Sequence, residues 1–189
     1  EILSGLVGSE MCIRDSCATF AAFSYCTPIL IEEVGLAPGQ VAPMLALYGV
    51  ANLIGNMLVG RVADSHTISV VGLGLAMMVL VMSVFALAGD NLWLNLSCFI
   101  AIGLTGVALN PAMVARVMKA AEPGALVNTL HTSVITAGLA FGSWAGGAAI
   151  EAGYGLRAPL WVGAAIALLG LLSVLRPLAS RHTATTPCT

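Results

Sequence analysis

Polar side chains recur every four residues inside two apolar stretches of the chain, where amide and hydroxyl groups could hydrogen-bond a solute. The residues at this spacing are Tyr48, Asn52 and Asn56, continued by Gly60, in one stretch, and Asn128, Thr132 and Thr136 in the other. Residues four apart lie along one face of a helix. Each group could instead hydrogen-bond a neighbouring helix, an interaction worth about 0.6–2 kcal/mol in membranes. We interpret the two faces as walls of a substrate cavity.

His131 adds a group that can exchange protons near neutral pH, inside the same stretch as Thr132. It could equally be a neutral histidine that hydrogen-bonds between helices. The full set of candidate cavity residues is Tyr25, Asn52, Asn56, Asn110, His131, Thr132 and Thr136.

Other chemistry has little support in the sequence. The five cysteines form no CxxC pair or metal-ligand spacing. No paired acids, Ser–His arrangement or clustered metal ligands occur within an apolar stretch, as an intramembrane enzyme would require. We expect no enzyme activity, no metal, no cofactor and no nucleic-acid partner.

The elements that carry these residues must lie in a lipid bilayer. The chain is 59% hydrophobic and 8% charged, with a mean hydropathy of +0.98, whereas soluble domains carry about 25% charged residues. Its apolar runs approach the roughly 20 residues that a helix needs to cross a membrane. They predict an all-α membrane protein with six transmembrane helices, at residues 17–31, 41–59, 68–88, 92–114, 125–150 and 159–175.

The positive charges predict the orientation of these spans. Basic residues are retained on the cytoplasmic side of short loops. The connections after the second and fourth spans and the tail carry five of them, whereas the other connections carry only Arg157. This pattern predicts that both ends of the six-span region are cytoplasmic.

Polar residues follow a period of three helices, since the third and sixth spans contain no strongly polar group. Pro28 and Pro111 lie in the first span of each triplet, where each can bend its helix. Two inverted three-helix repeats, typical of secondary transporters, would produce this pattern. Gly138, Gly142 and Gly146 also lie four apart, and such small residues let a neighbouring helix pack closely.

The two ends of the chain differ from its apolar middle, residues 17–177. Residues 1–16 are not a signal peptide, because their basic residue follows the apolar stretch. Residues 7–16 resemble translated adapter sequence, so we expect 1–16 to be foreign, the alternative being a short cytoplasmic lead-in. Residues 178–189 are polar and are expected to form a disordered cytoplasmic tail.

Four segments resemble the C-terminal half of a major facilitator superfamily transporter, from the drug/proton antiporter branch that includes arabinose-type efflux permeases. They are Tyr25-x-x-Pro28-x-Leu30, residues 55–64, residues 138–147 and Trp161-Val162-Gly163. The resemblance implies that Gly60, Arg61 and Asp64 belong to a cytoplasmic loop whose charges latch one conformation. After Asp64 the sequence departs from the family pattern, with Ser65 and His66 in place of basic residues.

The resemblance also implies a function and partners. It implies efflux of a small amphipathic molecule by alternating access, driven by protons, in a bacterial-type inner membrane. The substrate would bind between this half and an N-terminal six-helix half, which would carry the coupling acid. The alternative is a complete six-helix subunit of a multi-component permease or channel, although the short loops here do not favour it.

Overall fold

The fold is all-helical in a computed structural model of the chain. The structure describes residues 2–89, 91–106 and 125–182, and it describes side chains at 13–61, 69–89, 91–106, 129 and 132–173. Within those ranges no strand occurs, which confirms the all-α prediction. The helices in chain order are α1 (Ile2–Phe23), α2 (Cys26–Pro28), η1 (Ile29–Glu33, a π-helix), α3 (Pro38–Leu87), α4 (Leu92–Thr105), α6 (Ala125–Ala149), η3 (Ile150–Tyr154, also a π-helix) and α7 (Ala158–His182).

The first helical region differs from the expected 17–31 span. Helix α1 already begins at Ile2, and helical structure resumes after a break at Ser24 and Tyr25 and continues to Glu33. Pro28 gives a physical reason for the break, because its ring clashes with the carbonyl of the residue four positions earlier, Ser24, and it has no N–H to donate there. The first helical region therefore begins before residue 17 and ends after residue 31.

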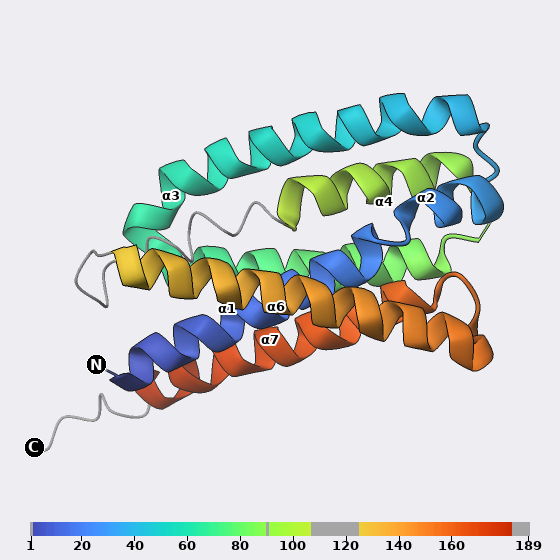
Figure 1. Cartoon of the computed structure of the whole chain (residues 1–189). Helices are drawn as coiled ribbons and strands as arrows, with labels where there is room; N and C mark the ends of the chain where they lie inside the picture. The colour runs from blue at the N-terminus through green and yellow to red at the C-terminus, as the bar shows by residue number, and fades with distance from the viewer. Residues whose placement is uncertain (1, 90, 107–124, 183–189) are drawn as a thin grey trace, which may run out of the picture.

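Helix α3 contains both spans expected at 41–59 and 68–88, and the predicted loop between them is wrong because the backbone stays helical. Its 50 residues would extend about 75 Å if straight, yet α3 turns back on itself (Figure 1). We call Pro38–Arg61 the first limb and Ser69–Leu87 the second limb. Leu58 of the first limb and Leu73 of the second line one shared cavity, so the limbs lie close together near this turn.

The remaining spans correspond to α4, α6 and α7. Helix α4 ends at Thr105, and residues 107–114 of the expected 92–114 span, which include Asn110 and Pro111, lie outside the described residues. Helix α6 with η3 covers the expected 125–150 span. Helix α7 continues to His182, beyond the expected end at 175, so the first residues of the predicted tail are helical.

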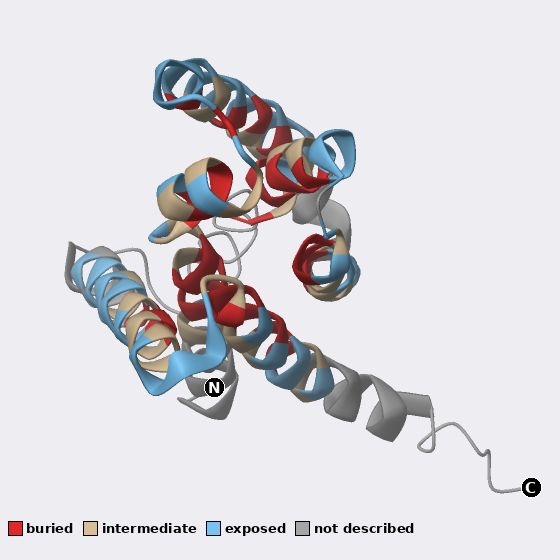
Figure 2. Cartoon of the chain, turned by 90° about the vertical axis from the view of Figure 1, so that its right-hand side faces the viewer, coloured by how far each residue is buried: buried red, intermediate tan, exposed pale blue. Residues whose placement is uncertain are grey.

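The helices pack around α1 and α7. Helix α1 contacts α6 and α7, while α3 contacts α4 and α7. Their buried stretches face the centre of the bundle and their exposed stretches face outward (Figure 2). The largest fully buried side chains include Leu30, Met78, Met82, Phe99 and Leu160.

The outer surface of the bundle is apolar. Leu53, Met57 and Leu73 are 63–67% exposed, an arrangement that water disfavours and lipid permits. In the described part of the chain, three segments are long and apolar enough to cross a membrane: Pro38–Arg61, Ser69–Leu87 and Thr132–Tyr154. Leu92–Thr105 and Ala158–Ser173 are shorter apolar helices. Helix α1 begins and α7 ends at the same end of the bundle (Figure 1).

Candidate functional site

The break after α1 is fastened to α6 by two polar contacts, both of which involve Ser143. The hydroxyls of Ser24 and Ser143 lie 2.6 Å apart, and the Tyr25 hydroxyl donates to the Ser143 carbonyl at 2.8 Å. The Tyr25 ring lies against Gly146 and Gly147, where an added Cβ would approach it to 2.8 and 2.5 Å. The absence of side chains at these two glycines therefore creates the space that the phenol occupies.

The glycines spaced four apart on α6 face the backbone of α1. A Cβ at Gly142 would lie 2.3 Å from the Cys17 carbonyl oxygen, and one at Gly146 would lie 3.1 Å from the Ala21 carbonyl oxygen. A Cβ at Gly138 would lie 3.0 Å from the Ile13 carbonyl oxygen. The two helices thus cross at backbone contact along this ridge, as small residues permit in membranes.

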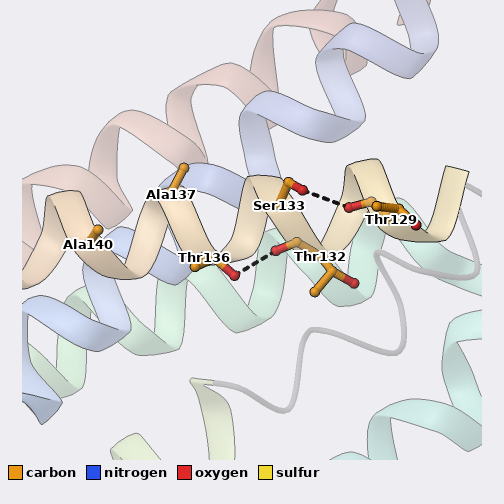
Figure 3. Close-up of a pocket in the computed structure, with 6 residues that line it drawn as sticks. All are labelled: Thr129, Thr132, Ser133, Thr136, Ala137 and Ala140. Atoms are coloured by element: carbon orange, nitrogen blue, oxygen red, sulfur yellow. Dashed lines mark hydrogen bonds between the residues drawn. The ribbon is translucent and has the colours of Figure 1, made fainter. Parts of the chain in front are cut away.

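Another face of α6 carries hydroxyl groups and lines an open groove of about 550 Å³. The lining residues, drawn in Figure 3, are Thr129, Thr132, Ser133, Thr136, Ala137 and Ala140. The Ser133 and Thr136 hydroxyls each donate at 2.9 Å to the carbonyl four residues earlier, that of Thr129 and Thr132 respectively. Since a hydroxyl has two acceptor lone pairs, both oxygens can still accept hydrogen bonds from a ligand.

The amide side chains of the first limb of α3 pair with each other. The Asn56 amide donates to the Asn52 carbonyl oxygen at 2.6 Å, and both residues are half-buried. One turn earlier, Tyr48 is buried between the rings of Phe23 and Phe99, at centroid distances of 5.1 and 5.0 Å. Its hydroxyl has no hydrogen-bond partner among the described residues. The predicted stripe therefore divides, with Tyr48 in the core and the asparagines at its border.

The structure brings only some of the predicted site residues together. Asn52 contacts Asn56, and Thr132 contacts Thr136, but the pairs lie on different helices, α3 and α6, which pack most extensively against α4 and α1 respectively. Asn110 and the side chain of His131 lie outside the described residues. In the predicted latch, Gly60 is half-buried and Arg61 is exposed at the end of the first limb, while the side chain of Asp64 is also outside the described part.

Sequence reasoning missed Ser24, Ser143 and the aromatic partners of Tyr48. Serine is common in membrane helices and apolar rings carry no polar signal, so neither stood out. It also left Arg157 unexplained, although a single arginine among connections that contain Glu33 would predict an ion pair. The described part of the chain contains no group of three metal-ligating side chains.

Comparison with known proteins decides the family. The model of the Major Facilitator Superfamily matches residues 16–187. The chain belongs to this family. Members are membrane transporters, which agrees with the apolar surface of the bundle and with the expectation of a protein that is not an enzyme.

Two of the curated relatives of this superfamily chain are named as transport proteins, and a third as a resistance protein. The Inner membrane transport protein YdhP of Escherichia coli (strain K12) is 32% identical over 92% of the chain and 44% of its own length. The Uncharacterized MFS-type transporter YtbD of Bacillus subtilis (strain 168) is 29% identical over 77% of the chain and 38% of its own length. The Chloramphenicol resistance protein of Streptomyces lividans is 23% identical over 82% of the chain and 40% of its own length. The chain thus spans less than half the length of these relatives.

Proposed function

We propose that this chain is the C-terminal half of a secondary transporter that exports a small amphipathic molecule by alternating access, driven by protons. The observation that carries the proposal is the hydroxyl-lined groove on the exposed face of α6. Polar groups at membrane depth face protein or a water-filled cavity and seldom face acyl chains. A second six-helix half covering this face would create such a cavity, and the span of the match supports a partner of that size.

The groove supports an amphipathic substrate. Hydroxyl oxygens with lone pairs alternate there with the methyl groups of Ala137 and Ala140. A drug-, sugar- or nucleoside-like molecule with donor groups and an apolar body would be bound by both kinds of surface. The name of the Streptomyces lividans relative connects that protein with chloramphenicol resistance, which supports the drug-like class.

The proposed architecture is two inverted repeats of three helices, as in other transporters. The first repeat would contain α1 to η1 and the two limbs of α3, and the second α4, α6 and α7. The second limb and α7 are the third helices of their repeats. They contact each other, and they carry apolar residues on both buried and exposed faces, which suits a supporting role at the lipid side.

We place the end of the bundle that contains Arg61 in the cytoplasm of a bacterial-type inner membrane. Arg61 supports this orientation, because basic residues are retained on the cytoplasmic side of short loops. The opposite end carries the exposed aromatic residues Trp93, Tyr154 and Trp161, which are typical of a membrane–water interface. Arg61 and Asp64, following Gly60, would then form the latch on the cytoplasmic face, and both ends of the six-helix region would be cytoplasmic.

Residues 1–16 remain proposed as foreign sequence. Asp15 is buried, and its Oδ1 has no hydrogen-bond partner among the described residues. A carboxylate buried without compensation is costly. The family match begins at residue 16, which supports the same boundary. We therefore assign Asp15 no part in proton coupling, and place the coupling acid in the other half.

Sequencing the reading frame upstream of Cys17 and expressing the complete protein tests the proposal. We expect six further apolar spans with at least one acid, and efflux of a fluorescent amphipathic dye from cells that stops when a protonophore collapses the proton gradient. A stop codon or a soluble domain upstream would instead favour a complete six-helix subunit of a permease or channel. Efflux that persists without the gradient would exclude proton coupling.

A further inference from the structure

Arg157 joins three separate parts of the chain at the end of the bundle opposite Arg61. It lies in the connection before α7, and its Nε donates to Glu33 Oε2 at 2.9 Å in an ion pair. Its Nη2 donates to the Gly89 carbonyl at 2.7 Å, and its Nη1 reaches the Ala86 carbonyl at 3.5 Å. One guanidinium therefore contacts the end of η1 and the end of α3.

Arg157 contacts two carbonyls at the end of α3: that of Ala86 in the last turn and that of Gly89 just beyond the helix. The last carbonyls of a helix lack intrahelical donors and carry the negative end of its dipole. Gly89 follows α3 in a left-handed conformation, with φ of +56°, which is common after a helix end and favours glycine. The planar fork of arginine, with five donors, can bind these carbonyls and Glu33 together.

Asn95 of α4 binds the same carbonyl from another side. Its amide donates to the Gly89 carbonyl at 3.0 Å, and the residue is fully buried. Gly89 is thus bound by one residue from α4 and by another from the segment before α7. Both belong to the proposed second repeat, whereas Glu33 and Gly89 belong to the first.

The position of Arg157 is costly under the proposed orientation. Basic residues are depleted from short loops on the outer side of a membrane, and Arg157 is the one basic residue that the sequence places there. Its side chain is 19% exposed and that of Glu33 is 35% exposed, so water screens the pair only in part. The contacts with Glu33, Ala86 and Gly89 give a local reason for keeping this charge.

We propose that Arg157 is a positioning residue that fastens the two three-helix repeats at their outer ends, so that the six helices move as one body during transport. The role of Arg157 in transport rests on the proposed function, whereas the fastening itself does not. Without Arg157, the end of α3 would lose the hydrogen bonds from this residue. Asn95 would then supply the remaining side-chain hydrogen bond between that end and the second repeat in the described part of the chain. The outer ends of the repeats would then separate more often.

Hydrogen–deuterium exchange in the complete protein, with Arg157→Gln and Arg157→Lys, tests the fastening. We expect Arg157→Gln to exchange roughly tenfold faster in peptides covering residues 86–95, since hydrogen bonds to a charged group are lost. Arg157→Lys, which can keep the ion pair, should restore part of the protection. Transport should lose maximal rate without a change in half-saturating dye concentration, because no cavity residue is altered.

Glu33→Gln and Glu32→Gln form a matched pair for the case in which Arg157→Gln does not fold. Both remove one carboxylate from η1, but Glu32 is exposed and forms no ion pair among the described residues. Glu33→Gln should increase exchange at 86–95, and Glu32→Gln should not. Equal exchange in the Glu33 and Glu32 variants, or unchanged exchange in Arg157→Gln, would overturn the proposal. Faster exchange in a protein that transports nothing would leave the fastening intact and remove the proposed function.

Discussion

The Tyr25 hydroxyl donates to the Ser143 carbonyl at 2.8 Å across 118 residues of sequence. The bond connects the break after α1 with the C-terminal half of α6, the helix that carries the hydroxyl-lined groove. The orientation of that groove relative to α1 therefore depends partly on one phenol.

Replacing Tyr25 with phenylalanine should lower the free energy of unfolding by about 1 kcal/mol, the usual contribution of one hydrogen bond. Thermal unfolding in detergent, followed by tryptophan fluorescence, measures the change. Tyr154→Phe is the matched control, because Tyr154 is 78% exposed. If both variants unfold at the same temperature, the bond to Ser143 contributes nothing to stability.

Gly142→Ala should destabilise the contact between α1 and α6. A Cβ there would approach the Cys17 carbonyl oxygen to 2.3 Å, so the helices must move apart at a cost of about 1–3 kcal/mol. Gly49→Ala is the control, since its added Cβ meets nothing within 4 Å on an exposed helix face. We expect a lower unfolding temperature for Gly142→Ala alone. A similar shift in both variants would argue against close crossing.

Tyr48→Phe should leave stability unchanged or raise it, by up to about 1 kcal/mol. The hydroxyl is buried and unpartnered among the described residues, whereas the ring contacts with Phe23 and Phe99 would remain. Tyr48→Ala should be strongly destabilising, because it would remove both ring contacts, and serves as the contrast. Clear destabilisation by Tyr48→Phe would show that the hydroxyl has a partner in residues 107–124 or in another part of the complete protein.

If His131 takes part in proton coupling, His131→Gln in the complete protein should reduce proton-driven efflux, because glutamine can hydrogen-bond but cannot carry a proton at neutral pH. Efflux driven by a substrate gradient alone should persist. A dye-loaded cell assay with and without a protonophore separates the two. Undiminished proton-driven efflux would make His131 an interhelical hydrogen-bonding residue.

The sequence predicted most helical segments because apolar length determines which residues lie in a membrane. Turn residues such as Gly89 also located several helix ends. The backbone conformation between the apolar segments was less predictable. Residues 60–67 are polar enough for a loop, yet their backbone remains helical. A break four residues before Pro28 follows from proline chemistry, but its attachment to α6 does not.

The candidate site was less predictable than the fold. A polar residue in an apolar helix must face protein or water, which identified Asn52, Asn56, Thr132 and Thr136. Hydropathy does not identify the partner, however, so the pairing of the asparagines was not foreseen. The roles of Arg157 and Ser143 depend on residues far away in sequence, and no local pattern encodes such contacts.

The hydrogen bonds of the α6 hydroxyls have a consequence for the selectivity of the groove toward its ligands. Ser133 and Thr136 direct their hydrogens at their own helix, so they present lone pairs, with no fixed donor, to whatever enters the groove. A wall of this kind would not reject a molecule for lacking one particular group, and a transporter built on it would accept chemically diverse compounds.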